Sequence, residues 1–350
     1  MNGINETGLS RPAHRASENG LPRPWLLADM GGTNARFGWL TEGLQAPTHV
    51  ITLRVADHAN PAAAARAYLA QLAQTVGAAY EPPRAAAFAV ATAVGQDQVN
   101  LTNSGWSFST AATRAELALD ALLVLNDFEA LALSLPRLRS GQVRAIAGRG
   151  GAAPAGLSGG ALAVIGPGTG LGVAGLVPTR HGWVAIPGEG GHATLSAADE
   201  FESALLAAVR RDIPHVSAER LLSGIGLPVL HRAVAAVLGQ AIAALPAEEI
   251  VDRGLAGHDA ACSQTLDSFC ALLGSFAGNV ALVLGARGGV YIGGGIVPRL
   301  GERFFGSQFR ARFEAKGRFE PYLRAIPTAL ITDTVAALGG AALALEQHGR

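Results

Sequence analysis

The alternation of apolar and polar segments along the chain predicts an α/β fold. Short apolar runs that end in glycine or polar residues are typical of buried strands. Helical spacing of apolar residues occurs between such runs, in Pro61–Val76 and repeatedly from Ala198 to Ala286. Strands that alternate with helices indicate an α/β protein. The runs that we interpret as strands are Trp25–Ala28, Arg36–Leu40, Ala85–Ala93, Ala121–Leu125, Ala161–Ile165, Gly172–Val177, Val290–Ile292 and Leu330–Thr332.

Two long uncharged segments, 150–179 and 268–286, resemble membrane spans in composition. Glycine and proline interrupt the first repeatedly, and irregular backbone cannot remain unpaired in lipid. The second segment carries small and polar residues such as Gly274 and Asn279, which suit a lipid-exposed helix poorly. We therefore expect a buried core helix whose apolar face is formed by Phe269, Leu272, Leu273, Phe276, Val280 and Leu284.

Length, charge and cysteine content narrow the functional classes. A chain of 350 residues is long enough for two lobes that share a cleft. Its 27 basic and 27 acidic side chains cancel, so nothing in the charge indicates nucleic acid or an anionic membrane as a partner. Cys262 and Cys270 form no CxxC pair and cannot build a disulfide framework, which favours a reducing cytosol. Residues 1–23 are polar, lack the apolar core of a signal peptide and are expected to form a disordered tail.

Three glycine-rich turns, each directly after an apolar strand, are the most specific local feature. They are DMGGTNAR (29–36), GPGTGLG (166–172) and GGGIVPR (293–299). Glycines allow backbone N–H groups to point at phosphate oxygens. The first is not a Walker A loop and the second does not match GxGxxG, and the strands that follow both turns predict hairpins. Each turn alone is compatible with an ordinary tight turn, but three in one chain suggest that several loops converge on one polyanionic ligand.

Asn126 and Asp127 end an apolar strand and are candidates for substrate chemistry. A carboxylate at that edge can accept a proton from a substrate hydroxyl. The alternative is a helix N-cap, because Asp is a good capping residue and the following residues have a helical pattern.

Two further segments carry acidic residues that could bind hydroxyl groups. In PGEGGH, Glu189 and His192 lie three residues apart across two glycines, so both can face one pocket. Glu219 follows Ser217 at a predicted helix start, where an acidic residue also complements the helix dipole.

Eight sequence blocks, read together, resemble the bacterial glucokinases of the hexokinase and actin-like ATPase superfamily. They occur in the family's order and with similar separations, and the resemblance spans about Trp25 to the C-terminal helix. The blocks are DMGGTNARFG, LTNSGW, LNDFEALA, GPGTGLGVA, PGEGGH, HVSAERLLSG, GGVYIGGGIVPR and FEAKGRF. This resemblance implies transfer of the γ-phosphoryl group of ATP to the 6-hydroxyl of glucose, with Mg²⁺ offsetting the phosphate charge.

The resemblance also implies roles for individual residues. Asp127 looks like the catalytic base. The glucose ligands would be Asn126, Asp127, Glu189, His192 and Glu219, with Asn103 in LTNSGW as a further candidate. Mg²⁺ would be bound mainly through the ATP phosphates, with no direct protein ligand and with Asp29 as a contact through water. The ATP-binding residues would be Ala28, Asp29, Met30, Gly31, Gly32, Thr33, Gly166, Gly168, Thr169, Gly170, Gly293, Gly294 and Gly295.

The fold implied by the resemblance is a two-lobed actin-like ATPase, of the ribonuclease H type, with mixed sheets and a cleft between the lobes. We place a small α/β domain at residues 24–137 plus 328–350 and a large α/β domain at 138–327. A cytoplasmic homodimer is what the family suggests.

Three alternatives stay open at this point. The first is a kinase of another hexose, such as mannose or fructose. The second is a sugar-binding regulator, which needs a helix-turn-helix module that the short polar tail cannot hold. The third is an actin-like ATPase, which needs the phosphate turns but not the set of Glu189, His192 and Glu219.

Overall fold

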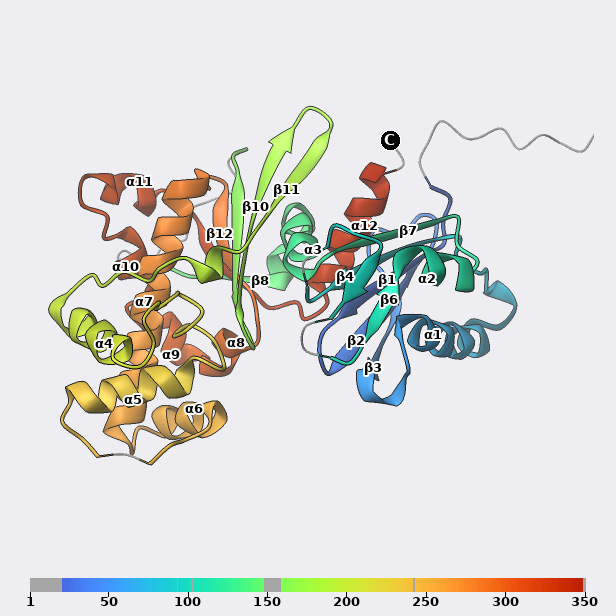
Figure 1. The fold of residues 1–350 in the computed structure, drawn as a ribbon. Coiled ribbons are helices and arrows are strands. Elements are labelled where there is room, and N and C mark those ends of the chain that lie inside the picture. Colours follow the sequence, from blue (N-terminus) through green and yellow to red (C-terminus); the bar gives the residue numbers. More distant parts are fainter. Residues whose placement is uncertain (1–20, 93, 102–103, 148–158, 242, 349–350) are drawn as a thin grey trace, which may run out of the picture.

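Two mixed sheets form the frame of the molecule (Figure 1). The computed structural model describes residues 21–92, 94–101, 104–147, 159–241 and 243–348. A five-stranded sheet has the strand order β3-β2-β1-β4-β7, and a six-stranded sheet has the order β11-β10-β9-β12-β13-β8. Both sheets contain parallel and antiparallel pairs. The predicted α/β architecture with mixed sheets and two lobes is therefore confirmed.

The smaller sheet has three parallel strands at its centre and one edge. β1 pairs in parallel with β4, and β4 pairs in parallel with β7, while β2 returns antiparallel to β1 through the first glycine turn. The strands and helices of this lobe are β1 (Trp25–Met30), β2 (Asn34–Leu40), β3 (Thr48–Arg54), β4 (Ala85–Val90), β5 (Gln98–Asn100), β6 (Ser107–Ser109), β7 (Ala121–Asn126), α1 (Pro61–Val76) and α2 (Thr110–Glu116).

The larger sheet is built around the hairpin of β9 and β10, which contains the second glycine turn. Its strands are β8 (Val143–Ala145), β9 (Leu162–Pro167), β10 (Leu171–Thr179), β11 (Gly182–Gly188), β12 (Gly289–Ile292) and β13 (Thr328–Ile331). The helices beside it are α4 (Glu200–Arg210), α5 (Leu227–Val237), α6 (Ala247–Ala256), α7 (Ala260–Leu284), α8 (Ile296–Leu300), α9 (Glu302–Phe305), α10 (Phe309–Glu314) and α11 (Glu320–Arg324).

Helices α3 (Asp127–Ser134) and α12 (Ala336–His348) lie between the two sheets (Figure 1). They pack so closely that a Cβ at Gly340 would lie 1.7 Å from the carbonyl oxygen of Ala130. One apolar cluster joins these helices to both sheets, with Leu27 on one side and Val164 on the other. The position of α3 is therefore fixed by the smaller and the larger sheet together.

Helix α7 is the core helix of the larger lobe. By length and composition it could cross a membrane, but 78% of its most apolar window is buried inside the protein. Phe269, Leu272 and Leu273 on this helix are fully buried, and so are Cys262 and Cys270. The prediction of a buried core helix over 268–286 is confirmed.

The domain boundaries and the tail differ in detail from the sequence prediction. β13 pairs with β12 and β8 in the larger sheet, whereas the predicted boundary at 328 places this strand in the smaller domain. Residues 1–20 of the predicted tail lie outside the described residues. At its end, Arg23 donates a hydrogen bond to the carbonyl oxygen of Leu44 (2.7 Å) and pairs with Glu346 of α12 (3.0 Å), so residue 23 is anchored to the fold.

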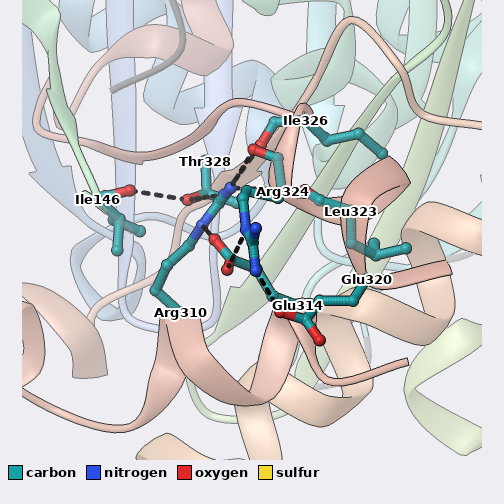
Figure 2. A network of polar contacts seen from close by, with 8 residues as sticks. All are labelled: Ile146, Arg310, Glu314, Glu320, Leu323, Arg324, Ile326 and Thr328. Carbon is teal, nitrogen blue, oxygen red and sulfur yellow. Dashed lines mark hydrogen bonds and ion pairs between the residues drawn. The ribbon is translucent and has the colours of Figure 1, made fainter. Parts of the chain in front are cut away.

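A buried arginine holds the last part of the larger lobe together (Figure 2). The guanidinium of Arg310 donates to Glu314 Oε1 at 2.7 Å, to the carbonyl oxygen of Ile326 at 2.8 Å and to Thr328 Oγ1 at 2.9 Å. Its other terminal nitrogen donates to the carbonyl oxygen of Arg324 at 2.9 Å. One side chain thus connects α10, α11 and β13, and it satisfies carbonyl groups that no strand or helix pairs.

We expect Arg310→Ala to lower the free energy of unfolding by about 3–5 kcal/mol. The substitution leaves the buried carboxylate of Glu314 without its main cationic partner, because the other one, Arg324, is mostly exposed and lies 3.6 Å away. Urea denaturation of both proteins measures the effect. Arg84→Ala, which removes an exposed arginine paired with Asp120, should leave the midpoint nearly unchanged. Equal effects of the two substitutions would contradict the structural role of Arg310.

Candidate active site

The carboxyl ends of β1, β4 and β7 bring Asp29 and Asp127 to one edge of the smaller sheet. In the sheet register, Met30 lies beside Val90, and Val90 lies beside Asn126. Because the three strands are parallel, their carboxyl ends lie together at one end of the sheet, where α/β proteins bind ligands. Asp127 follows β7 directly as the first residue of α3.

The side chain of Asn126 caps α3. Its Oδ1 accepts hydrogen bonds from the backbone N–H groups of Phe128 (2.9 Å) and Glu129 (3.3 Å), and its amide donates to the carbonyl oxygen of Thr92 (3.1 Å). A helix N-cap was expected here because Asp caps well, but the capping residue is Asn126, and Asp127 is the first residue of the helix. Because its acceptor and one donor are already engaged within the protein, Asn126 can offer a ligand only its remaining amide hydrogen.

The carboxylate of Asp127 is held at the helix start but is not neutralised. Oδ1 accepts a hydrogen bond from the N–H of Phe128 at 2.9 Å. Burial, followed by the negative charge of Asp29, raises the pKa of Asp127 to about 6. Burial also raises the pKa of Asp29, against the opposing effect of Arg36, whose Nη1 lies 3.2 Å from Asp29 Oδ2. A carboxylate with a raised pKa in a sheet-edge site has the properties of a general base.

The first glycine turn leaves backbone donors free. The N–H of Gly31 donates to the carbonyl oxygen of Asn34 at 3.0 Å, which closes the turn between β1 and β2. The N–H groups of Gly32 and Thr33 have no acceptor among the described residues. They are available to an anion beside Asp29.

The second and third turns lie against each other. The N–H of Gly168 donates to the carbonyl oxygen of Gly170 at 2.8 Å, and the N–H groups of Thr169 and Gly170 have no acceptor within the described part of the chain. Gly294 has φ +75°, and a Cβ there would lie 2.3 Å from the carbonyl oxygen of Pro167. Only glycine fits this position, so the third turn closes directly onto β9.

Glu219 is bound to the second turn. Its Oε2 accepts the N–H of Leu171 at 2.8 Å, and a Cβ at Gly170 would lie 2.5 Å from the same oxygen. His192 Nε2 lies 3.8 Å from Glu219 Oε1, and the histidine side chain is 62% exposed while that of Glu219 is 24% exposed. The pair therefore lies beside the hairpin of β9 and β10, on a side that is open to solvent.

The prediction of a helix start at Ser217 is wrong. Residues 218–226 form a series of turns, and the next helix, α5, begins at Leu227. The N–H groups of Ala218 and Glu219 bond back to the carbonyl oxygens of Ala193 (2.9 Å) and Gly191 (2.8 Å), and the N–H of Gly224 bonds to Gly168 (2.8 Å). Local turn bonds are present as well, since the N–H of Leu222 bonds to the carbonyl oxygen of Ala218 at 2.8 Å, and the long-range bonds join Glu219 to the PGEGGH segment.

The remaining predicted site residues make few side-chain contacts that would define a role. Glu189 precedes the short 3₁₀ turn Gly190–His192, and its carbonyl oxygen accepts the N–H of His192 at 3.0 Å, but its side chain is exposed and has no partner among the residues described. Asn103 lies outside the described residues. Ala28, Met30 and Gly166 are buried, so they support the backbone of the turns from inside the protein.

Two residues of the site were missed by sequence reasoning. Arg36 pairs with Asp29, and the hairpin register that places them opposite each other could have revealed this contact. Phe128 contacts the second hairpin, with its ring against Gly166 and Gly172. Its sequence signal was weak, because an aromatic residue in the first turn of a helix is ordinary.

The site fits a magnesium ion held mainly by substrate phosphates. Within the described ranges no cluster of three or more His, Cys, Asp or Glu side chains could hold a metal by itself. Mg²⁺ usually keeps several waters and is bound by one or two carboxylates together with phosphates. Asp29 offers a carboxylate of this kind, at the end of β1 beside the free N–H groups of the first turn.

The comparisons with known proteins agree on one family. The family model for glucokinase matches residues 26–348. The chain is 49% identical over 323 residues to a glucokinase of Aromatoleum aromaticum, covering 92% of this chain and 95% of that one. It is 50% identical over 334 residues to a glucokinase of Chromobacterium violaceum, covering 94% and 92%. Among solved structures, a glucokinase from an Antarctic psychrotroph superposes with a TM-score of 0.82 at 38% identity, covering 92% of this chain and 98% of that one.

Proposed function

The chain belongs to the glucokinase family, and on this premise we propose that Asp127 accepts the proton of the glucose 6-hydroxyl while the three glycine turns hold ATP. It is an ATP-dependent sugar kinase that phosphorylates glucose, and it has the two-lobed actin-like ATPase fold of that family. The observation that supports the residue assignment best is the position of Asp127. This partly buried carboxylate begins a helix that contacts both the smaller sheet and the hairpin of β9 and β10.

Positioning and charge neutralisation are the main tasks in phosphoryl transfer. The free N–H groups of Gly32, Thr33, Thr169 and Gly170 are donors for phosphate oxygens. The third turn, at Gly294, would line the adenosine side because it closes onto β9 next to the second turn. Mg²⁺, near Asp29, would supply charge neutralisation for the phosphates.

The sugar would be oriented by the side chains that border the hairpin. Glu219 keeps Oε1 free because Oε2 is engaged by Leu171, and His192 lies beside it. Glu189 and the remaining amide hydrogen of Asn126 would complete the set. Groups that bind several hydroxyls at once discriminate against a sugar with a misplaced hydroxyl, because that hydroxyl leaves a polar group of the closed site unpaired.

The raised pKa of Asp127 predicts an acidic limb in the pH profile. The base must be ionised to accept a proton, so kcat/KM for glucose should fall about tenfold per pH unit below the pKa of about 6 and level off above it. Initial rates between pH 4.5 and 8, with stability checked at each pH, measure this. A profile that stays flat down to pH 5 would contradict the assignment of Asp127 as the base.

Compartment and oligomeric state belong to the proposal as well. Two buried, unpaired thiols suit a reducing cytoplasm. A homodimer remains a proposal from the family resemblance, and neither nucleic acid nor a membrane is proposed as a partner.

The substrate assignment is tested by measuring ADP formation from Mg-ATP with glucose, mannose, fructose or no sugar, with identification of the product. We expect turnover with glucose that yields glucose 6-phosphate. Turnover with another hexose alone would retain the mechanism and change the substrate. Equal rates with and without sugar would contradict a kinase and favour an ATPase of the same fold.

A further inference from the structure

Phe128 contacts both the proposed base, Asp127, and the hairpin of β9 and β10. Its backbone N–H donates to both Asn126 Oδ1 and Asp127 Oδ1, each at 2.9 Å. Its ring lies against the two strands that flank the second glycine turn. A Cβ at Gly166 would lie 2.3 Å from the ring, and a Cβ at Gly172 would lie 2.1 Å from it.

The absence of side chains at Gly166 and Gly172 leaves a space, called the seat below, that the ring of Phe128 occupies. For Gly172 the three nearest atoms to an added Cβ all belong to Phe128, and for Gly166 the two nearest do. Neither glycine has the positive φ that would require glycine for backbone reasons. Their lack of a side chain is therefore explained by the ring that packs on them.

The same face of α3 makes a second contact with the larger lobe. Leu131, one turn after Phe128, lies 2.9 Å from the position of a Cβ at Gly293 in the third turn. On the opposite side, the backbone of α3 is pressed against α12 at Gly340. A helix held on both sides cannot shift without moving its first residue, Asp127.

We propose that Phe128 is a positioning residue that sets the distance between the Asp127 carboxylate and the phosphate turn at 168–170. This inference rests on the proposed function, in which Asp127 is the base. In-line transfer requires the sugar oxygen, its base and the γ-phosphate to be aligned, and a displacement of about 1 Å can cost about 10²-fold in rate. The ring acts as a spacer of fixed thickness between the start of α3 and the strands β9 and β10 that carry this turn.

Phe128→Ala should lower kcat about 10–100-fold while the KM values for glucose and ATP change by less than about threefold. The substrates keep their own ligands, and only the alignment of the reacting groups is lost. Phe128→Leu should recover part of the loss because it keeps most of the spacer. Leu133→Ala, on the same helix in the apolar cluster, controls for stability: it should lower the melting temperature without this split between kcat and KM.

Gly172→Ala provides an independent test that keeps the aromatic ring. The added methyl group occupies ring space, so the single variant should also lower kcat by about tenfold or more. In the Phe128→Ala background the seat is empty, so the same methyl group should lower kcat only slightly. We therefore expect the double variant to be far more active than the product of the two single effects, by about tenfold or more.

Two results would overturn the inference. One is a kcat for Phe128→Ala, or for Phe128→Leu and Gly172→Ala should the alanine variant not fold, that equals wild type. The other is a double variant whose effects are simply additive. Asp127→Asn measured in the same assay separates the two proposals: loss of activity there, with normal rates for the Phe128 variants, removes the positioning role and leaves the base intact.

Discussion

Asp127→Asn should lower kcat by about 10²–10⁴-fold, the usual contribution of a general base, while glucose still binds. Asparagine has nearly the same shape and can still accept the hydrogen bond that Phe128 N–H donates to Oδ1 (2.9 Å). It cannot accept a proton. The loss should therefore appear in kcat more than in the KM for glucose.

The pH profile of the variant sharpens this test. With no group of pKa about 6 at position 127, its residual activity should lack the acidic limb of the wild type. Asp29→Asn is a useful comparison, because it removes the neighbouring charge and should lower the pKa of Asp127, moving the limb to lower pH. Near-normal turnover of Asp127→Asn would exclude Asp127 as the base.

Glu219→Ala should lower kcat/KM for glucose about 10²–10⁴-fold. The substitution removes two charge-assisted hydrogen bonds, one to the N–H of Leu171 and one to a sugar hydroxyl, each worth about 1.5–3 kcal/mol. The first bond fixes the hairpin that presents Thr169 and Gly170 to phosphate. We therefore expect the KM for ATP to rise too, although less than that for glucose.

Glu219→Gln separates the two roles of the glutamate. Its amide oxygen can still accept the N–H of Leu171, so the hairpin stays in place and only the charge toward the sugar is lost. We expect a smaller loss in kcat/KM and a normal KM for ATP. Glu200→Ala, which removes an exposed glutamate at the start of α4, should behave as wild type. If Glu219→Ala were equally harmless, Glu219 would have no place in the sugar site.

The sequence predicted the buried elements well and the exposed ones poorly. α1 begins and ends at the predicted residues, and β1, β4 and β7 lie where apolar runs were read as strands. β3 and β11 were missed; both are edge strands with few buried residues, and although β11 contains the apolar run 183–186, Val184 and Ile186 in it are exposed. Hydrophobic burial is the signal that sequence reasoning detects, and edge strands provide little of it.

Within the site, local patterns identified residues but not their contacts. The turn at 29–36 and the Asn126–Asp127 pair were recognised from strand ends followed by polar residues. The bond between Glu219 and Leu171, the pairing of Asp29 with Arg36 and the seat for Phe128 depend on segments that are distant in sequence or on strand register. At Ser217 the local pattern was read correctly only for one turn: the N–H of Leu222 bonds to the carbonyl oxygen of Ala218, but no regular helix follows before α5.

In the closed complex, the glucose 6-hydroxyl, the Asp127 carboxylate and the γ-phosphate of ATP are expected to lie next to one another. A crystal structure with glucose and a non-hydrolysable ATP analogue tests this most directly. We predict the glucose 6-hydroxyl oxygen within about 2.6–3.2 Å of an Asp127 carboxylate oxygen, with the terminal phosphate bound by the N–H groups of the first and second turns. A 6-hydroxyl that faces away from Asp127, or a phosphate bound elsewhere, would contradict it.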